Sequence, residues 1–448
     1  MGYASAVLER TALIVSQTYP PDPAAVGQHM HDVAAGLAGG LVGDRSQATG
    51  LNGDVEEEKG EGWRVVTLAS AKGYDDPSQR YPRKEQLDGV RVRRLRLSHF
   101  GKGSIAVRLL GGLLFCLQAG IRGLLVRRLR VVVVTTSPPM GPLVGLWLRW
   151  VRRVPFVFWA MDINPDQMIA MGKTAAGRLP AQLFEWMVVK TLRRAAAVVA
   201  LDEFMAERLL AKLPEAERAG LQERMVVVPP WPAHEPVASD RAKRGRAFRE
   251  AQEWVGRFVV MYSGNLSPVH PLDTALDAAA LLQERGQSRV LFVFIGGGLG
   301  KEAVERVKAE RGLENVVTLP YQPVEVLEES LSSADVHLVS MGEAMVGIVH
   351  PCKVYGVMAV GRPVVLVGPE RSHAGRIVGE ERCGYRVDHG DAAGLAELLV
   401  RLSGEAARDE LEAVGETGLE RSRTAYGKRL LCGRFCGVVE RAALGVRG

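Results

Sequence analysis

Residues 258–266 read Phe-Val-Val-Met-Tyr-Ser-Gly-Asn-Leu, and this stretch decides the fold. Its apolar residues follow one another without alternation, which is typical of a strand buried on both faces of a parallel sheet. A glycine ends the run, and a helical pattern begins near Leu272. A strand, a glycine turn and a helix form the repeating unit of a doubly wound sheet, so we predict an α/β fold.

Strand-like runs of the same kind lie on both sides of this unit. They cover residues 12–16, 131–135, 156–159 and 198–201 upstream, and 290–295, 316–319, 336–340 and 363–367 downstream, with helical patterns such as 27–37, 105–126 and 179–194 between them. The alternation restarts after a proline-rich, charged stretch at 229–256, which has the composition of a linker. We therefore predict two Rossmann-like doubly wound domains, 1–235 and 236–419, that face a central cleft. A helix at about 420–448 is a candidate to pack back on the first domain.

The bulk composition is that of a large globular protein. The 448 residues are 47% hydrophobic and 24% charged, which provides enough apolar material for two cores. A net charge of +6 is mild for this length and does not require nucleic acid as a partner. Five scattered cysteines argue against a disulfide framework and favour a reducing cytosol, so we expect a cytoplasmic protein. The polar, acidic stretch 43–62 is predicted to be a mobile surface loop.

Two segments of the first domain raise the question of a membrane. Residues 105–126 are strongly apolar, but Arg108, Gln118 and Arg122 interrupt them, so we expect an amphipathic helix rather than a transmembrane span. That helix either faces the core or touches a membrane surface. An aromatic–basic cluster follows, which fits either docking at a lipid interface or a solvated helix end. It consists of Trp147, Arg149, Trp150, Arg152 and Arg153.

Glycine-bearing loops at the ends of predicted strands are candidate anion sites. Gly27 follows a prolyl loop at the start of the first helix, Gly264 and Asn265 follow one strand, and Gly297 and Gly298 follow another. Ligands of doubly wound folds bind at the carboxyl ends of strands, where helix N-termini favour anions and glycines let a ligand approach the backbone. The first loop lacks a Gly-x-Gly-x-x-Gly fingerprint, so a dinucleotide is not indicated.

Charged and polar residues after other strands complete the set of candidates. Lys353 begins a short predicted helix after Pro351 and Cys352, and a lysine there opposes the helix dipole unless an anion is bound. We therefore prefer Lys353 as the phosphate contact. Asp162 and Asp166 follow the strand 156–159 and fit either acceptor hydroxyls or, for Asp162, the cap of the next helix.

These motifs together resemble the GT-B glycosyltransferases, specifically glycosyltransferase family 4, over essentially the whole chain. The matching pieces are Tyr19-Pro20-Pro21, Met161-Asp162-Ile163-Asn164-Pro165, Tyr262-Ser263-Gly264-Asn265-Leu266 with His270, and Gly361-Arg362-Pro363-Val364. The resemblance implies a nucleotide-sugar donor held mainly by the second domain and an acceptor held by the first. It also implies retention of the anomeric configuration without a metal or other cofactor, because backbone N–H groups and basic side chains neutralise the departing diphosphate.

The chain departs from the family pattern at four positions. Asn265 and His270 stand where the family usually has an arginine and a lysine that grip the diphosphate, and Ile348 and Gly356 stand where it has two glutamates. We expect Lys353 to supply the missing positive charge, and His270 to add to it when protonated. The resemblance also places the nucleobase edge at Tyr321 and Gln322, and it puts Tyr355 among the donor-binding residues.

The expected function is that of a hexosyl-type glycosyltransferase in surface or extracellular polysaccharide synthesis. The donor would be a UDP- or GDP-sugar and the acceptor a sugar or a polyprenyl-linked sugar, with peripheral contact to the inner face of an anionic membrane. Lys353, His270 and Asp162 are the expected catalytic residues. The expected donor-binding residues are Gly27, Gly264, Asn265, Gly297, Gly298, Tyr321, Gln322, Pro351, Cys352 and Tyr355. Two alternatives stay open: a nucleotide-sugar epimerase of the same fold, and a non-catalytic nucleotide-sugar-binding protein.

Overall fold

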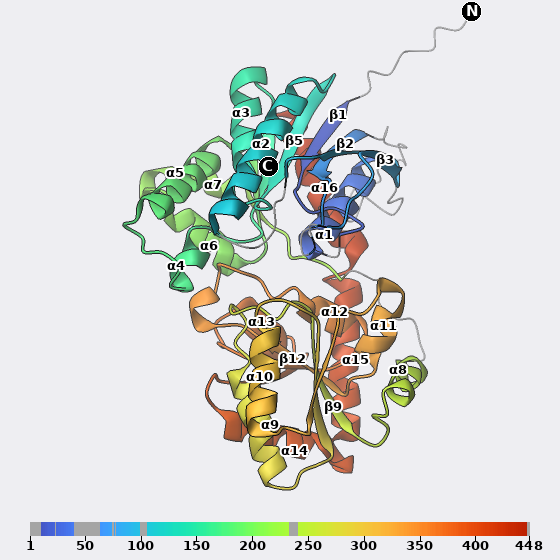
Figure 1. Ribbon diagram of the computed structural model, residues 1–448. Helices are drawn as coiled ribbons and strands as arrows, with labels where there is room; N and C mark the ends of the chain where they lie inside the picture. The colour runs from blue at the N-terminus through green and yellow to red at the C-terminus, as the bar shows by residue number, and fades with distance from the viewer. Residues whose placement is uncertain are drawn as a thin grey trace, which may run out of the picture. The chain divides into compact units, whose positions relative to one another are not determined.

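The protein consists of two compact units, which we describe from a computed structural model (Figure 1). The structure describes residues 10–22, 24–39, 63–73, 76, 78–98, 105–232 and 241–445, so the predicted loop at 43–62 lies outside the described residues. Unit 1 contains Met1–Pro229 and Lys428–Gly448, and unit 2 contains Pro230–Gly427. The expected domain boundary at 235/236 lies a few residues after the observed one at 229/230. The C-terminal segment that belongs to unit 1 begins at Lys428.

Unit 1 is built on a sheet of eight strands in the order β3-β4-β2-β1-β5-β6-β7-β8. Every pairing in this sheet is parallel except β3 with β4, which form an antiparallel edge. The bounds are β1 (Thr11–Val15), β2 (Arg64–Ser70), β3 (Lys84–Leu87), β4 (Val90–Leu95), β5 (Leu129–Thr135), β6 (Phe156–Trp159), β7 (Ala197–Ala200) and β8 (Met225–Val227). The strand order reverses at β1, which lies between β2 and β5, as in a doubly wound fold.

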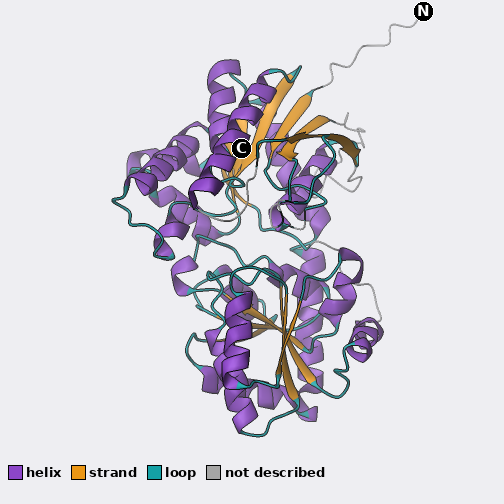
Figure 2. Cartoon of the chain, viewed as in Figure 1, coloured by secondary structure: helices purple, strands orange, loops and turns teal. Residues whose placement is uncertain are grey.

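Helices cover both faces of this sheet (Figure 2). They are α1 (Ala25–Leu37), α2 (Ile105–Leu124), α3 (Pro142–Arg152), α4 (Asp166–Ala170), α5 (Leu179–Arg194), α6 (Glu203–Ala211), α7 (Glu215–Gln222) and α16 (Lys428–Leu444). The helix α16 packs on α1 and on β5, β6 and β7, where the Phe435 ring lies 4.3 Å from the Trp159 ring, centroid to centroid. Right-handed crossovers place α2, α3 and α5 on the face opposite α1 and α16.

Unit 2 is built on six parallel strands in the order β11-β10-β9-β12-β13-β14. They are β9 (Phe258–Ser263), β10 (Val290–Ile295), β11 (Val316–Leu319), β12 (Val336–Ser340), β13 (Val364–Val367) and β14 (Gly384–Val387). The helices are α8 (Arg241–Ala251), α9 (Asp273–Glu284), α10 (Lys301–Arg311), α11 (Val324–Ser332), α12 (Lys353–Ala359), α13 (His373–Gly379), α14 (Ala392–Ser403) and α15 (Arg408–Thr424), with short 3-10 turns η2 (Glu343–Met345) and η3 (Glu405–Ala407). The order again reverses at the first strand of the unit, β9.

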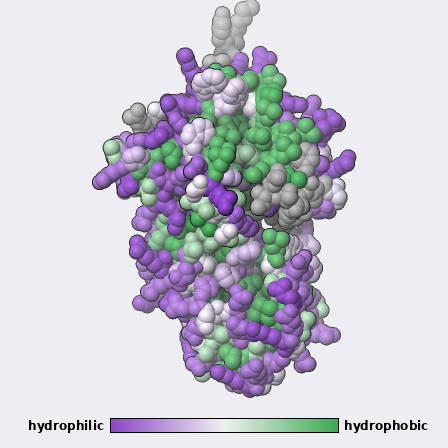
Figure 3. All heavy atoms as spheres, turned by 60° about the vertical axis from the view of Figure 1, so that its left-hand side comes forward, coloured by the Kyte–Doolittle hydropathy of each residue, from purple (hydrophilic) through white to green (hydrophobic). Residues whose placement is uncertain are grey.

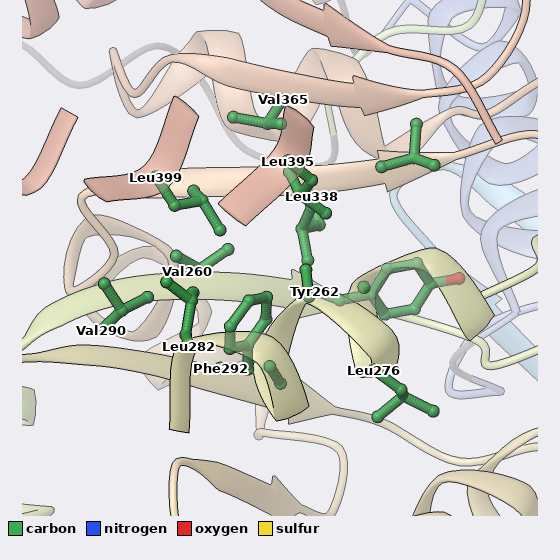
Figure 4. Packing of buried hydrophobic residues seen from close by; sticks show 14 of the residues in the cluster. Val260, Tyr262, Leu276, Leu282, Val290, Phe292, Leu338, Val365, Leu395 and Leu399 are labelled. Atoms are coloured by element: carbon green, nitrogen blue, oxygen red, sulfur yellow. The ribbon is translucent and has the colours of Figure 1, made fainter. Parts of the chain in front are cut away.

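The core of unit 2 forms where α9 and α14 pack on the sheet (Figure 4). Val260, Phe292 and Leu338 project from three neighbouring strands toward Leu395 and Leu399 of α14. All five side chains are at most 2% exposed, and burial of each contributes roughly 1.5–3 kcal/mol to folding. The Tyr262 ring belongs to the same core, but its hydroxyl points away from the labelled aliphatic residues. The core thus reaches to the carboxyl end of β9.

The two sheets confirm the predicted α/β fold class, and four strands of unit 2 match their predicted bounds, namely 258–263, 290–295, 316–319 and 336–340. The last helix differs from the prediction. Two helices, α15 and α16, stand in this part of the chain, and the break between them at residues 425–427 is where the chain passes from unit 2 to unit 1. None of the five cysteines, all of which the structure describes, forms a disulfide.

Candidate functional site

The first candidate site lies at the carboxyl edge of the unit 2 sheet, where the strand order reverses between β9 and β12. Connections from these two strands leave in opposite directions, and this geometry opens a crevice in doubly wound folds. Gly264 follows β9, and Ser340 ends β12. The loops after β9 and β10 and the segment that leads into α12 carry most of the predicted donor-binding residues.

The loops after β9 and β10 are joined backbone to backbone. The Leu266 N–H donates to the Gly297 carbonyl at 2.8 Å, and the Gly300 N–H donates to the Leu266 carbonyl at 2.8 Å. A Cβ at Gly296 would overlap the Gly264 carbonyl oxygen, and one at Gly298 would overlap Oδ1 of Asn265. Since both glycines also have left-handed φ angles of +144° and +107°, only glycine fits these positions without strain.

Lys353 lies beside these loops with its ammonium group buried. Its Nζ stands 3.4 Å from the centroid of the Tyr262 ring, and it has no hydrogen-bond acceptor among the described residues. Burial lowers the pKa of Lys353 from 10.5 to about 7. A cation–π contact is worth about 2 kcal/mol when desolvated, which is less than the cost of burying an unpaired charge. The site is therefore electrostatically incomplete and suits a bound anion.

The Lys353 side chain runs next to the backbone of Gly264. A Cβ at Gly264 would lie 3.5 Å from Cε and 3.7 Å from Nζ of Lys353, and the φ angle of Gly264 is +128°. Asn265 is exposed, and Oδ1 of its side chain faces Gly298. Lys353, Gly264, Asn265 and Gly298 thus lie together at this edge of the sheet, and their role in phosphate binding stays a prediction.

His270 adds a hydrogen-bonding group to this site rather than a charge. Nδ1 of His270 lies 2.7 Å from the Ser340 carbonyl oxygen, so Nδ1 carries the proton and Nε2 is left as an acceptor. Burial, with a further contribution from the Lys353 charge, lowers the pKa of His270 to about 3. The expectation that His270 adds positive charge to the site is therefore wrong near neutral pH, because its buried imidazole stays neutral.

Tyr321 and Gln322 follow β11 at the same edge of the sheet. The Tyr321 ring lies against Gly297, where a Cβ would approach Cε2 to 3.1 Å, and the residue is 44% exposed. The Gln322 amide donates to the Pro320 carbonyl at 2.9 Å, within its own turn. An exposed aromatic ring on a glycine surface offers a stacking platform for a base. The assignment of the nucleobase edge to these residues stays a prediction.

The segment before α12 is held by a chain of buried polar groups that sequence reasoning missed. The Tyr355 hydroxyl lies 2.7 Å from Nε2 of His350 and 3.0 Å from Nε2 of His373. Pro351 is buried beside them, and the Cys352 thiol donates to the His350 carbonyl at 3.4 Å. Tyr355 therefore anchors the segment that carries Lys353, rather than presenting its hydroxyl at a surface. His373 begins α13, and no spacing in the sequence links it to His350.

Ile348 and Gly356, which stand at the glutamate positions of the resembled family, have apolar surroundings. Ile348 is 1% exposed, and a Cβ at Gly356 would meet Cδ1 of Leu331 at 3.8 Å. Leu331 forms a small apolar cluster with Val360. A carboxylate at position 348 would be buried among apolar side chains, which is costly for a charged group, whereas Gly356 is partly exposed.

The second candidate site lies in unit 1, around Asp162. This residue lines a small pocket with room for about one water molecule, together with Thr136, Pro139, Pro142, Phe158, Ala160, Ile163, Asn164, Met187, Val188 and Leu209. Burial raises the pKa of Asp162 from 3.8 to about 6. Asp162 does not cap the next helix, α4. The N-cap position of α4 is Pro165, and no side chain forms a capping hydrogen bond there. Asp166, the other predicted acceptor contact, is instead ion-paired with Arg208 and Lys212.

Gly27 belongs to unit 1, whereas the other predicted donor-binding residues belong to unit 2. A Cβ at Gly27 would lie 2.8 Å from the Tyr19 nitrogen, and the Gly27 N–H donates to the Ala24 carbonyl at 2.9 Å. Close packing of α1 against the preceding loop therefore explains this glycine without a ligand. The helix histidines are also structural: His29 bonds the Ala25 carbonyl, and His31 bonds the Tyr19 hydroxyl and Asp88.

Comparison with known families covers both units. Residues 47–231 match the family described as "Glycosyl transferase 4-like domain", and residues 257–405 match "Glycosyl transferases group 1". The chain is 24% identical over 277 residues to "Probable glycosyltransferase WbjE" of Pseudomonas aeruginosa, which covers 61% of this chain and 66% of that protein. It is 32% identical over 139 residues to the amylovoran biosynthesis glycosyltransferase AmsK of Erwinia amylovora, covering 30% of this chain and 33% of that protein. The matches thus span less than two thirds of these relatives' own length.

Solved structures with the same architecture match over nearly the full chain. The HepE protein of Anabaena, crystallised in complex with UDP and glucose, superposes with a TM-score of 0.65 at 13% identity, covering 96% of this chain and 99% of that one. An α,α-trehalose-phosphate synthase (UDP-forming) from Burkholderia vietnamiensis gives a TM-score of 0.67 at 14% identity, with 97% of each chain covered. At these identities the likeness establishes the fold.

Proposed function

The chain belongs to the GT-B glycosyltransferases of the family-4 type, and on that premise we propose that it transfers a sugar from a nucleoside diphosphate sugar bound by unit 2. The observation that carries the proposal is the buried, unpaired ammonium group of Lys353 beside the glycine loops after β9 and β10. A diphosphate oxygen would complete the coordination of this group and make a charge-assisted hydrogen bond, which is the strong kind.

The same groups would act on the leaving diphosphate. Negative charge grows on the β-phosphate as the bond to the sugar breaks, and a preorganised cation and dipoles stabilise that charge without reorganising. Lys353 supplies the cation, and the neutral His270 leaves Nε2 as an acceptor for a hydroxyl group. We propose that Asn265 and the exposed Tyr321 contact the phosphate and the base, respectively.

Unit 1 would bind the acceptor through the pocket around Asp162. The carboxyl group stands at a pocket lined by apolar side chains such as Phe158, Met187 and Leu209, and its own pKa is raised by burial. A carboxylate of this kind is a good hydrogen-bond acceptor for a sugar hydroxyl. The relatives named for polysaccharide synthesis favour an oligosaccharide acceptor, and we propose a polyprenyl-linked one at the cytoplasmic face of the membrane.

Titration calorimetry with nucleotides tests the donor assignment. We expect UDP or GDP and the corresponding sugars to bind, and the parent nucleosides to bind at least about tenfold more weakly, because the nucleosides lack the diphosphate. Equal binding of nucleoside and diphosphate would remove the proposed role of Lys353. Loss of binding in a Lys353→Met variant, with binding kept in Lys308→Met on α10, would support it.

Product analysis separates transfer from its alternatives. We propose a hexosyl transfer that retains the anomeric configuration and needs no metal, so NMR of the product should show the donor's anomeric form, and EDTA should leave the rate unchanged. Formation of an epimer from the donor alone would identify an epimerase. Nucleotide binding without turnover on any lipid-linked or free oligosaccharide would identify a binding protein.

A further inference from the structure

The helix α2 has one face that unit 1 does not cover. Leu110, Leu113, Leu117 and Ile121 recur at helical spacing along this face and are 50–59% exposed. The opposite face of α2 is packed in unit 1, with Phe115 and Ala119 fully buried. By length and composition α2 is the described helix that could cross a membrane, over Val107–Leu124, but only 39% of that window is buried. The structure therefore presents α2 as an amphipathic helix with an open apolar stripe.

Two further helices extend this stripe. The helix α3 packs against α2 on one side and α5 on the other. Trp147 of α3 fits against Gly120 of α2, where a Cβ would lie 3.2 Å from Cδ1 of the indole, and its ring lies 5.5 Å from that of Trp150. Trp150 is 76% exposed. The stripe on α2 and the tryptophan pair on α3 are thus contiguous.

The helix α5 carries a third exposed apolar row, formed by Leu179, Leu183 and Trp186. We call the exposed rows of α2, α3 and α5 together the apolar face of unit 1. Hydrophobic residues gather on this side of unit 1 in Figure 3, which is turned to bring it forward. Patches of this kind are uncommon on proteins that stay fully in water, because exposed apolar area is costly.

Positive charge surrounds the apolar face. Residues 105–161, which include α2 and α3, contain eight arginines and no aspartate or glutamate. In α5 the one acid, Glu185, is paired with Lys212, while Lys190 continues the exposed row one turn after Trp186. Arg122 and Arg149 are exposed beside the stripe. Apolar residues with interfacial tryptophans, bordered by cations, match the chemistry of an anionic bilayer surface.

We propose that the apolar face of unit 1 docks on a membrane that contains anionic lipids, with α2, α3 and α5 lying in the plane of the interface. A two-fold dimer would set the same cationic border against itself, so charge complementarity favours lipid over a second copy. The apolar face belongs to unit 1 and the proposed nucleotide site to unit 2. Membrane docking deepens the proposed function, and only its link to a lipid-linked acceptor rests on that function.

Vesicle flotation with the full chain tests this proposal. We expect flotation with vesicles of phosphatidylcholine mixed with phosphatidylglycerol, weaker flotation with phosphatidylcholine alone, and a loss of the difference at high salt. The double variant Leu117→Ser/Trp150→Ser should bind at least about tenfold more weakly. The control Val255→Ser, at an exposed apolar residue of unit 2 that is 67% exposed, should bind as the wild type does.

Reversing the charge of exposed arginines provides a second test of membrane docking. Arg122→Glu/Arg149→Glu should lose the preference for anionic vesicles, whereas Arg285→Glu/Arg289→Glu on unit 2 should keep it. Nucleotide binding, measured by calorimetry, should be unchanged in all four variants, which separates this proposal from the donor assignment. Absence of flotation, or equal effects of face and control variants, would overturn it. So would light scattering that shows a dimer dispersed by Leu117→Ser/Trp150→Ser.

Discussion

Units 1 and 2 reverse their strand order at β1 and β9 in the same way, but the carboxyl edges of the two sheets bury opposite charges. Unit 2 buries a cation, Lys353, with no acceptor for Nζ among the described residues. Unit 1 buries an anion, Asp162, beside a pocket of mainly apolar side chains. Burial moves both pKa values toward neutrality, to about 7 for Lys353 and about 6 for Asp162.

The difference shows how one fold serves two kinds of ligand. Each buried group loses hydration and gains no fixed counter-charge, so each is stabilised by a ligand of complementary chemistry. For Lys353 that ligand is an anion such as a diphosphate, and for Asp162 it is a hydroxyl-bearing molecule. Substitution of either buried group should therefore impair binding of its own ligand and spare that of the other.

Removing the cation should have the largest effect. Lys353→Met should lower kcat/KM for the donor about 100- to 1000-fold, because the leaving diphosphate loses its charged partner. The control Lys308→Met should leave kcat/KM unchanged.

Lys353 should also lower the stability of the wild type at low pH. Burial lowers its pKa from 10.5 to about 7, so the buried charge reduces the free energy of unfolding most below pH 7, and this loss disappears as pH approaches 10.5. Lys353→Met should therefore raise Tm at pH 6 and not at pH 10, which thermal unfolding measures.

Adding a side chain at Gly296, where two loops meet backbone to backbone, should have the second largest effect. Gly296→Ala forces a Cβ onto the Gly264 carbonyl at a φ of +144° and should lower the free energy of unfolding by about 2–4 kcal/mol in urea titrations. Gly286 also has positive φ, but a Cβ there meets nothing within 4 Å, so Gly286→Ala should cost about 1 kcal/mol. Equal costs would show that the two loops do not need their close backbone contact.

The affinity for the donor should depend on pH through the charge of Lys353. Lys353 loses its proton as pH rises through about 7, so the Kd for the diphosphate should rise by up to about tenfold per pH unit above that value. Lys353→Arg should flatten the profile, because a guanidinium stays charged. Calorimetry between pH 6 and 9 measures it, and a flat wild-type profile would mean that the ammonium does not meet the phosphate.

Neutralising the anion of unit 1 should affect the acceptor and spare the donor. We expect kcat/KM for the acceptor to rise with pH through about 6 in the wild type, as Asp162 ionises, and to lose this limb and fall about tenfold in Asp162→Asn. Because burial raises the folded-state pKa from 3.8 to about 6, the stability that protonated Asp162 contributes is lost as pH rises between these values, so the Asn variant should be more stable than the wild type at pH 7. A change in donor Kd would contradict this division of roles.

His270 should give the smallest effect. Loss of the bond from Nδ1 to the Ser340 carbonyl in His270→Ala should cost about 1 kcal/mol of stability, and His270→Asn, which keeps an N–H donor, should recover part of it. His389→Ala, which removes a similar bond to the Met341 carbonyl, is the matched control for stability. The pH profile of donor binding should not change between about pH 5 and 8, because the pKa of His270 is about 3.

Much of the fold was predictable because its strands are buried on both faces. The strand 258–263 and the strand 290–295 are uninterrupted apolar runs, and the structure reproduces their bounds. In contrast, β4 alternates valines with arginines near the edge of its sheet, and we did not predict it. The break between α15 and α16 was also missed, because it follows from the passage of the chain between two units and not from a strong helix breaker alone.

The site was predictable in its residue types and only partly in its contacts. Lys353, Gly264 and Gly298 were predicted from local turn and helix chemistry, and the structure places them at one edge of the unit 2 sheet, whereas Gly27 belongs to unit 1. Tyr262 beneath the ammonium and Ser340 beside His270 come from segments far apart in sequence, and His373 joins the nearby pair His350 and Tyr355 from the next helix. No pattern within a single sequence indicates such pairs.

Local composition was enough to establish a doubly wound α/β chain with glycine loops and a lysine at their edge, because backbone geometry and strand burial depend on near neighbours. Protonation is different, because it depends on how much water the whole fold removes from a side chain. That is why the lowered pKa values of His270 and Lys353 and the raised pKa of Asp162 emerge only once distant strands and helices have been packed around them.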